Sequence, residues 1–385
     1  MFGITMTLEM TSRERLLAAL AHKEPDRVPI DLGGTLASGI NYQAYDELLD
    51  CLGLEDDWTW ESLRAHTAKV AESVRQRLHL DCVQVGLSGP PPARIWQEGD
   101  LEYYRDEWGI DWACPPGGHY YTASVPFAGE PTLSDLDAYS WPDPGAPVWT
   151  EGLAARVDAA RRLGDYAICL NVPVGFIHQT QFVRGYEGWL TDLLLNRKFA
   201  EGLMDRVLEF QLEIYRRALD VVGDQVDVIC FGDDIGFQTG PMVSPRIYEQ
   251  IIAPRQRKVF DTLHAHSPAP VWYHTCGSVA SLIPQLIDMG VDVLNPIQVS
   301  ATGMEPAALK REYGKDLAFW GAIDTHKVMP YGSPQDVREE VRRRIDELSD
   351  GGGFVLAAVH VVQHGVPAAN VVAMCEEAVQ YGRRS

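Results

Sequence analysis

The chain has 385 residues, of which 46% are hydrophobic, and its formal net charge is −21. This charge argues against binding to nucleic acid or to an anionic membrane surface, because both need clusters of Lys and Arg. The sequence lacks an apolar run long enough for a transmembrane span and the basic and apolar regions of a signal peptide. Seven cysteines, mostly inside apolar runs, are typical of a reduced, cytoplasmic protein.

The N-terminal part of the chain is predicted to contain helices over residues 13–21, 41–52 and 61–78. Short strands are predicted at 28–31 and 81–85. Residues 93–124 are rich in Trp, Tyr and Gly, which indicates a β-hairpin insertion followed by a loop to about residue 147. The aromatic side chains of this 93–147 insertion either pack a small β-layer or line a pocket.

From residue 150 the predicted elements alternate regularly between helices and apolar strands. The strands are 167–171, 227–231, 271–273, 292–295, 317–320 and 353–357. The helices are 150–163, 177–196, 197–222, 245–266, 279–289, 305–313, 333–349 and 370–381. With the two early strands, this order makes eight apolar strands separated by helices. It predicts an α/β fold, a single (β/α)8 TIM-barrel domain over residues 1–385 with extra N-terminal helices.

Polar, ligand-capable residues follow almost every predicted strand. They are Asp31, Ser88, Asn171, Asp233 and Asp234, His274 and Cys276, Asn295 and Gln298, Asp324, and His360. Active sites of such barrels lie at the C-terminal ends of the strands. One residue of this kind is usually a cap or a turn residue, but six or more at one level indicate a site.

His274 and Cys276 are separated by one residue after an apolar strand, so both side chains point to the same side of an extended chain. A nitrogen and a sulfur ligand placed in this way predict a zinc-type site at the mouth of the barrel. Alone, the pattern is weak, because a single histidine is more often a hydrogen-bonding core residue or a substrate contact.

The other candidate residues have two interpretations each. Asp233 and Asp234 cannot easily both face the mouth, and repulsion and desolvation would raise the pKa of the one that does; the other would cap a helix. Asp31 and Asp324 either contact substrate or cap, and Arg184 binds a substrate anion or pairs with Glu187. The residues assigned to substrate binding are Asp31, Asn171, Arg184, Tyr273, Gln298 and Asp324.

Several segments resemble one known family. They are residues 13–20, 24–29, 184–187, 232–234, 321–324, 332–334 and 366–371. On these segments the chain resembles the uroporphyrinogen decarboxylase superfamily, which includes decarboxylases of haem biosynthesis and zinc-dependent methyltransferases that use methylcobamide and coenzyme M. The resemblance implies a (β/α)8 barrel that forms a homodimer.

The sequence carries one motif from each branch of this superfamily. The methyltransferase branch has His-x-Cys, matched here by His274 and Cys276, and a third cysteine ligand whose place is taken by His360. The decarboxylase branch has a histidine that also aligns with His360. The decarboxylase branch also has an Arg-Gln-Ala-Gly-Arg stretch whose arginines meet the substrate carboxylates, and this chain has Asp31 in that region instead. Residues 85–88 lack the aspartate that the decarboxylases carry there. An acidic mouth would repel a porphyrinogen.

The resemblance therefore implies a zinc-dependent methyltransferase-like enzyme with His274, Cys276 and His360 as metal ligands, and with Asp233 or Asp234 in the catalytic site. One thiolate and two imidazoles leave the centre near +1, a stronger Lewis acid than a centre with two thiolates. The predicted substrate is a small methylated or methoxylated molecule. Methylcobalamin or another corrinoid would come from a partner protein, because the chain has no Asp-x-His-x-x-Gly stretch.

Two alternatives remain open at this point. The first is a metal-free decarboxylase of a small carboxylic acid or porphyrinogen, in which His360 and an aspartate act as acid and base. The second is a non-catalytic binder of a small molecule.

Overall fold

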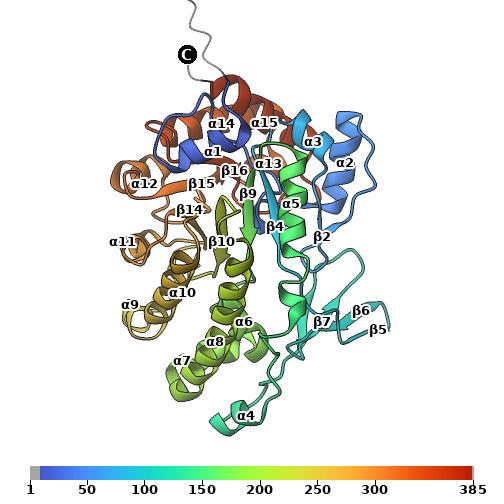
Figure 1. Cartoon of the computed structure of the whole chain (residues 1–385), viewed down its shortest axis with the longest axis vertical. Coiled ribbons are helices and arrows are strands. Elements are labelled where there is room, and N and C mark those ends of the chain that lie inside the picture. Colours follow the sequence, from blue (N-terminus) through green and yellow to red (C-terminus); the bar gives the residue numbers. More distant parts are fainter. Residues whose placement is uncertain (1–8, 384–385) are drawn as a thin grey trace, which may run out of the picture.

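The computed structural model describes residues 9–383. The expectation that the N-terminus has no signal peptide falls partly on residues 1–8, which lie outside the described residues. Its centre is a curled parallel sheet with the strand order β16-β15-β14-β13-β10-β9-β4 (Figure 1). The strands are β4 (Cys82–Gly86), β9 (Ala167–Asn171), β10 (Val228–Gly232), β13 (Val271–His274), β14 (Val293–Asn295), β15 (Ala318–Ile323) and β16 (Phe354–Ala358). All are nearly continuous apolar runs, because both faces of the sheet are covered.

The predicted first strand, residues 28–31, is reduced to one parallel bridge between Ile30 and Leu356. The amide of Asp31 donates to the carbonyl of Leu356 at 2.9 Å, and the amide of Asp81 donates to the carbonyl of Ile30 at 2.9 Å. This closing segment, residues 28–31, therefore lies between β16 and β4, the two edge strands of the sheet, and closes the barrel. The prediction of a (β/α)8 barrel-like α/β fold is confirmed.

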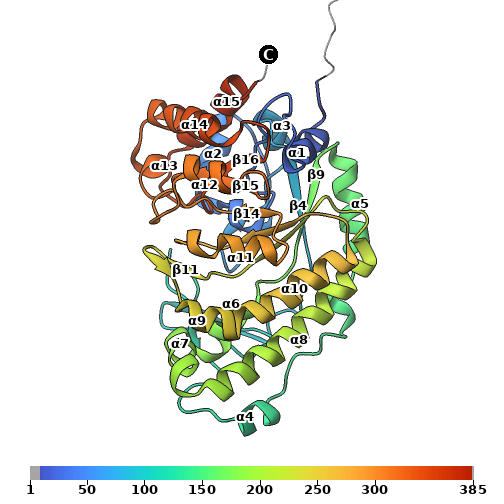
Figure 2. The same cartoon turned by 90° about the vertical axis from the view of Figure 1, so that its left-hand side faces the viewer.

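Helices surround the sheet (Figures 1 and 2). The longer ones are α1 (Ser12–Leu20), α2 (Tyr42–Leu52), α5 (Leu153–Leu163), α6 (Phe176–Arg184), α7 (Tyr186–Leu195), α8 (Arg197–Val222), α10 (Ala253–His266), α12 (Pro306–Tyr313), α14 (Pro334–Leu348) and α15 (Ala368–Tyr381). The shorter ones are α3 (Glu72–Arg77), α4 (Leu133–Ala138), α9 (Pro245–Ile247), α11 (Ile283–Asp288) and α13 (Val328–Tyr331). Within residues 9–383, none of these helices has the length and apolar character needed to cross a membrane.

The helix predicted over residues 61–78 is wrong. The chain forms β2 (Trp60–Ser62) and β3 (Thr67–Ala68), which pair in an antiparallel sheet with β1 (Ile40–Asn41), and only α3 is helical. His66 has a positive φ of 53°, which breaks any helix at this point. The apolar spacing resembled a helical repeat, but the aromatic and β-branched residues here satisfy their backbone groups in a sheet.

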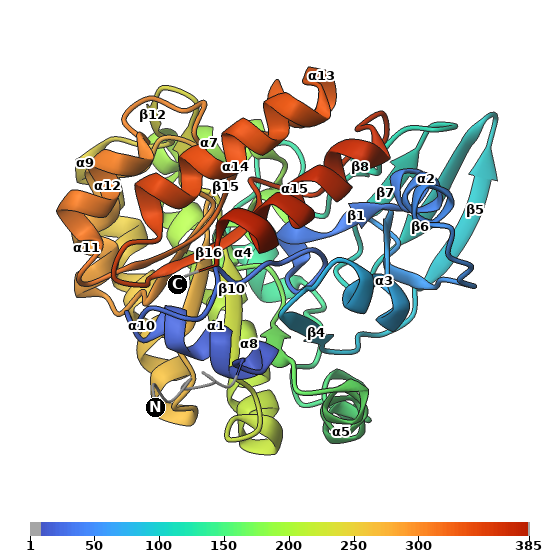
Figure 3. The ribbon, with the colours of Figure 1, turned by 90° about the horizontal axis from the view of Figure 1, so that it is seen from above.

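The predicted hairpin is the first half of a larger sheet. β5 (Arg94–Glu98), β6 (Leu101–Arg105), β7 (Asp111–Cys114) and β8 (Tyr121–Ser124) pair in antiparallel order, and α4 interrupts the loop expected to reach residue 147. Figure 3 shows this sheet at the side of the barrel where β1 and α2 also lie. The turn between β2 and β3 contacts the loop between β7 and β8, with the ring centroids of His66 and Tyr120 5.5 Å apart.

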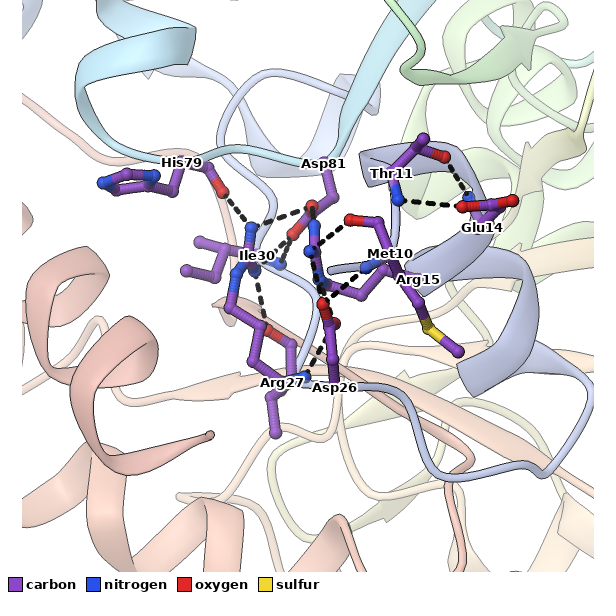
Figure 4. Close-up of polar contacts among 10 residues, drawn as sticks. Met10, Thr11, Glu14, Arg15, Asp26, Arg27, Ile30, His79 and Asp81 are labelled. Carbon is purple, nitrogen blue, oxygen red and sulfur yellow. Dashed lines mark hydrogen bonds and ion pairs between the residues drawn. The ribbon is translucent and has the colours of Figure 1, made fainter. Parts of the chain in front are cut away.

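A buried ion cluster holds the closing segment, residues 28–31, in place (Figure 4). The carboxylate of Asp81, whose side chain is fully buried, contacts Nη1 of Arg15 and Nη1 of Arg27 at 2.7 Å each. Its Oδ2 atom also accepts a hydrogen bond from the amide of Ile30 at 2.8 Å. Arg15 binds a second carboxylate, that of Asp26. The Asp81 side chain thus connects α1, the closing segment and β4.

Replacing Asp81 with asparagine should strongly destabilise the protein. Two buried guanidinium groups would lose their shared counter-charge, and breaking a buried pair in this way costs about 3–5 kcal/mol. Urea unfolding measures the free energy. The matched control is Asp137→Asn, which breaks the exposed pair with Arg206 and should cost less than about 1 kcal/mol. Equal losses in the two variants would contradict the role assigned to the cluster.

Candidate functional site

His274, Cys276 and His360 converge at the C-terminal end of the barrel. His274 ends β13 and points into the barrel, because it stacks on Trp272 with ring centroids 5.8 Å apart. Cys276 Sγ lies 3.4 Å from His274 Nε2. His360 follows β16, and its ring centroid is 5.5 Å from that of His274. One ligand atom from each residue lies within 4.8 Å of the other two.

This donor set fits a zinc-type ion. Ordinary Zn–N and Zn–S bonds in a tetrahedral site place nitrogen and sulfur about 3.6 Å apart, close to the observed separation of His274 and Cys276. His274 Nδ1 lies 2.6 Å from Asn295 Oδ1, and the side-chain nitrogen Nδ2 of Asn295 donates to the carbonyl of Trp320. That second bond fixes the orientation of the amide, so Nδ1 of His274 carries the proton and Nε2 is free to coordinate.

Both histidines of the cluster are held in the neutral form. Burial lowers the pKa of His274, against the opposing effect of Asp234. Loss of solvation, reinforced by His274, lowers the pKa of His360 to about 4, although the His360 side chain still reaches solvent at the mouth. Burial and the Asp234 carboxylate raise the pKa of the Cys276 thiol. Neutral imidazoles are the form that binds a metal, and the thiol would have to lose its proton on binding.

Asp233 and Asp234 point to different places, and only Asp234 reaches the cluster. Asp234 Oδ1 accepts a hydrogen bond from the amide of Cys276 at 2.7 Å and lies 3.8 Å from His274 Nε2. Burial would raise the pKa of Asp234, but His178, His274 and the Cys276 amide hold it well below its usual range. The expected rise in the pKa of the carboxylate at the mouth is therefore wrong.

Asp233, which follows β10, caps the N-terminus of α6 with its side chain. Its carboxylate accepts hydrogen bonds from the amides of Ile177 and His178 at 3.2 and 2.8 Å. A Cβ atom on Gly175, the N-cap position of α6, would lie only 2.0 Å from Asp233 Oδ2. Glycine at 175 therefore leaves the space that this carboxylate occupies, and complete burial raises the pKa of Asp233.

His178 lies between the two carboxylates. Its Nδ1 is 3.3 Å from Asp233, and its Nε2 is 3.5 Å from Asp234. Burial alone would lower the pKa of His178, but the two carboxylates raise it to about 10. A histidine at this position therefore carries a positive charge at neutral pH, beside the neutral pair His274 and His360.

Two of the residues assigned to substrate lie inside the barrel wall. The Asp31 carboxylate is buried, accepting hydrogen bonds from the Gly34 amide and Trp320 Nε1, and burial raises its pKa. Its charge is thus not displayed at the mouth, which corrects the argument that it would repel an anionic substrate. Asn171 accepts from the amide of Leu36 and donates to Gln84.

Two others are directed away from the cluster. The Tyr273 ring lies on the outer face of the sheet, stacked with Phe231, and its hydroxyl donates to the carbonyl of Asp233. Arg184 forms a 2.6 Å ion pair with Asp192, and not with Glu187, and also donates to the carbonyl of Phe127. Both have structural contacts, and neither is brought together with His274.

The last two hold loops in position. Gln298 Oε1 accepts from the amide of Gly277 at 2.7 Å, so it holds the turn that follows Cys276. The Asp324 carboxylate accepts hydrogen bonds from the amides of His326 and Lys327. It therefore holds the turn before α13 and does not cap that helix, whose N-cap residue is Lys327.

Sequence reasoning undervalued Asn295 and His178. The sequence predicts Asn295 only as a strand-end residue, yet its register opposite His274 on the neighbouring strand makes it the hydrogen-bond partner of that histidine. The role of His178 depends on Asp233 and Asp234, which lie more than 50 residues away in the sequence. A polar residue at the end of each of two adjacent strands was the available signal for Asn295.

The charge on His178 predicts a pH dependence of stability. Its pKa is raised in the folded state from about 6.5 in the unfolded chain, so its contribution is complete below about pH 6.5 and disappears as the pH rises through about 10. The difference in unfolding free energy between wild type and His178→Gln should therefore shrink over that range. Urea titrations at several pH values measure it, with the exposed His364→Gln as control. A difference that grows with pH would contradict the assignment.

Comparisons with known proteins identify the relatives of this barrel. The family profile described as Uroporphyrinogen decarboxylase (URO-D) matches residues 176–381. A solved methyltransferase from Methanosarcina mazei has a TM-score of 0.68 and 18% sequence identity, over 97% of this chain and 99% of that chain. At this identity the likeness shows a shared fold.

Weaker structural likenesses are those to glycosidases. A GH113 beta-1,4-mannanase has a TM-score of 0.40 and 12% identity, over 91% of this chain and 98% of its own. The native xylanase 10B from Thermotoga maritima has a TM-score of 0.40 and 13% identity, over 62% and 82%. Neither carries an argument about this chain, and curated protein sequences give no match. The URO-D profile covers more than half of the sequence and includes His274, Cys276 and His360, and the chain belongs to the uroporphyrinogen decarboxylase (URO-D) family.

Proposed function

We propose that the protein is a zinc-dependent methyltransferase that works with a corrinoid on a small methylated or methoxylated molecule. The observation that carries the proposal is the convergence of His274, Cys276 and His360, whose ligand atoms lie within 4.8 Å of one another. Three protein ligands with one open position are the donor set of catalytic zinc. The methyltransferase fold of the Methanosarcina mazei protein agrees with this interpretation.

When bound, zinc would supply Lewis acidity to an oxygen or sulfur atom of the substrate. The chain's own residues prepare the site for it. Asn295 orients the His274 ring, and Asp234 holds the backbone of Cys276 through its amide. His178 keeps a proton beside Asp234, in a position to balance that carboxylate and to protonate a leaving oxygen.

The exposed side of the cluster favours a protein-borne methyl donor. His360 reaches solvent at the mouth, whereas His274 and Cys276 lie deeper, so an external partner would approach from the His360 side. We assign the corrinoid to a partner protein, because this sequence has no stretch that would supply an axial histidine.

A metal-free decarboxylase is the second candidate. It is favoured by the His178, Asp233 and Asp234 group, which has matched acid and base components without any metal. The buried position of Asp31 also removes one objection to an anionic substrate. Residues 31–35 still lack the Arg-Gln-Ala-Gly-Arg stretch that would meet the carboxylates of a porphyrinogen, so a smaller carboxylic acid would be the substrate.

Metal analysis of the purified protein tests the site directly. We expect about one zinc per chain, lost in Cys276→Ser and in His360→Ala, because each removes one of three ligands. Asn295→Ala should weaken zinc binding about 10- to 100-fold, the usual effect of losing the partner of a ligand. Cys51→Ser, which changes an exposed cysteine of α2, is the matched control. If wild type takes up no zinc after reconstitution, or both ligand variants keep it, the site is not zinc-binding.

Activity assays then separate the two candidate functions. Free methylcobalamin should lose its methyl group to a thiol and leave cob(I)alamin, and free cob(I)alamin should take a methyl group from a methoxylated compound. Corrinoid absorbance follows both reactions. His178→Gln should lower kcat by about 10²- to 10⁴-fold while zinc content is unchanged, because it removes an acid and not a ligand. Release of carbon dioxide from small carboxylic acids by metal-free protein, without methyl transfer, would favour the decarboxylase instead.

A further inference from the structure

Arg64 lies in the turn between β2 and β3 and contacts two other parts of the mouth. Its guanidinium carbon Cζ is 4.9 Å from the ring centroid of Trp112 on β7 and 4.9 Å from that of Phe182 on α6. Helix α6 directly follows β9, and Figure 1 shows α6 and β7 beyond the C-terminal end of that strand. Cation–π contacts with the two rings therefore hold Arg64 at the end of the barrel where His274 lies.

Phe182 connects Arg64 to the candidate metal site. It lies one turn after His178 on α6, and the two rings are stacked with their centroids 5.9 Å apart. The Nε2 atom of His178 is 3.5 Å from Asp234 Oδ2, and Asp234 Oδ1 is 3.8 Å from His274 Nε2. Two rings and one carboxylate thus lead from the guanidinium of Arg64 to the first candidate zinc ligand.

The guanidinium of Arg64 is open to solvent. Among the residues that the structure describes, its three nitrogens have no hydrogen-bond or ion-pair partner, and none of the three is buried. The rings of Trp112 and Phe182 offer no oxygen acceptor, so the N–H donors of Arg64 stay available to a ligand. A guanidinium held by rings is also preorganised for a planar anion such as a carboxylate.

Two carboxylates lie near Arg64 without forming an ion pair with it. The oxygens of Asp106 accept hydrogen bonds from Trp112 Nε1 and from two backbone amides of the same turn. Burial raises the pKa of Glu107, against the opposing effect of Arg64. The charge that lacks a direct partner here is therefore the positive one, and it favours an anionic ligand.

We propose that Arg64 binds a carboxylate group of the substrate. The inference rests on the proposed function, because it makes the substrate a methylated or methoxylated carboxylic acid whose other end reaches the zinc ligands. The carboxylate would accept two hydrogen bonds from the guanidinium, and the body of the molecule would lie along the rings of Phe182 and His178. An aromatic body suits this path, since it can stack on or meet the edges of these rings.

Calorimetric titration of the whole chain with 4-methoxybenzoate tests the proposal. We expect saturable binding with a Kd below about 1 mM, and at least about tenfold weaker binding of 4-methoxybenzamide, the neutral analogue of similar shape. Arg64→Met keeps an unbranched side chain between the rings and removes the charge. It should weaken binding of the acid at least about tenfold and leave binding of the amide unchanged.

The matched control is Arg94→Gln. Arg94 also lies over a ring, with Cζ 4.7 Å from the centroid of Trp96, but it belongs to β5, the edge strand of the four-stranded sheet. Its loss should leave the affinity for 4-methoxybenzoate unchanged. Far-ultraviolet circular dichroism shows that each variant is folded. Arg64→Gln repeats the test with a polar side chain, and the comparison of acid with amide needs no variant.

The same titration on Cys276→Ser separates this site from the metal. A carboxylate held by Arg64 keeps its affinity there within about threefold, whereas one bound to zinc loses it. No step uses a corrinoid, so a failure of methyl transfer would contradict the proposed function and not the role of Arg64. Three results would overturn that role: no saturable binding of the acid, equal affinity for the amide, or affinity that depends on Cys276 and not on Arg64.

Discussion

The structure depends on aspartates that precede strands and accept a backbone N–H from the neighbouring strand. Asp81 binds the amide of Ile30, Asp227 that of Ile168, and Asp292 that of Val271, at 2.7–2.8 Å. Two of them also carry arginine partners, Arg15 and Arg27 on Asp81, and Arg13 and Arg161 on Asp227. Each contact fixes the start of one strand against the next. In a parallel barrel this sets the register, and with it the height at which every strand ends.

The register determines the chemistry of the site, because successive residues of a strand point to opposite faces. In β13, Trp272 packs with the small residues inside the barrel, Tyr273 lies among the outer aromatic side chains, and His274 points inward again. A shift by one residue would direct His274 into the helix layer. The same register places Asn295 opposite His274, so one strand supplies the histidine and its neighbour supplies the group that orients its ring.

The sequence predicted those parts of the fold that follow from local apolar pattern. Seven of the eight predicted strands and most helices appear where hydrophobic runs and breaks placed them. Residues 61–78 were misassigned, because the packed rings of Tyr42, Trp58 and Trp60 and the positive φ of His66 favour a small sheet. The site was predicted where a motif is continuous, as with His274 and Cys276. It was not predicted where a role depends on distant partners. Arg184 pairs with Asp192, Asp31 is bonded to Trp320, and His178 owes its charge to two aspartates on another strand end.

Gly175 links the backbone of α6 to the electrostatics of the whole site. The carboxylate of Asp233 fills the volume that any larger residue at 175 would need, and from there it holds both the first turn of α6 and the ring of His178. Positions 175 and 233 are therefore not independent during sequence divergence. A relative that gained a side chain at 175 would have to shorten or move the acid at 233, and its histidine at 178 would then tend to be neutral. The protonation state of His178 thus depends on two positions together, and position 175 contributes by having no Cβ atom.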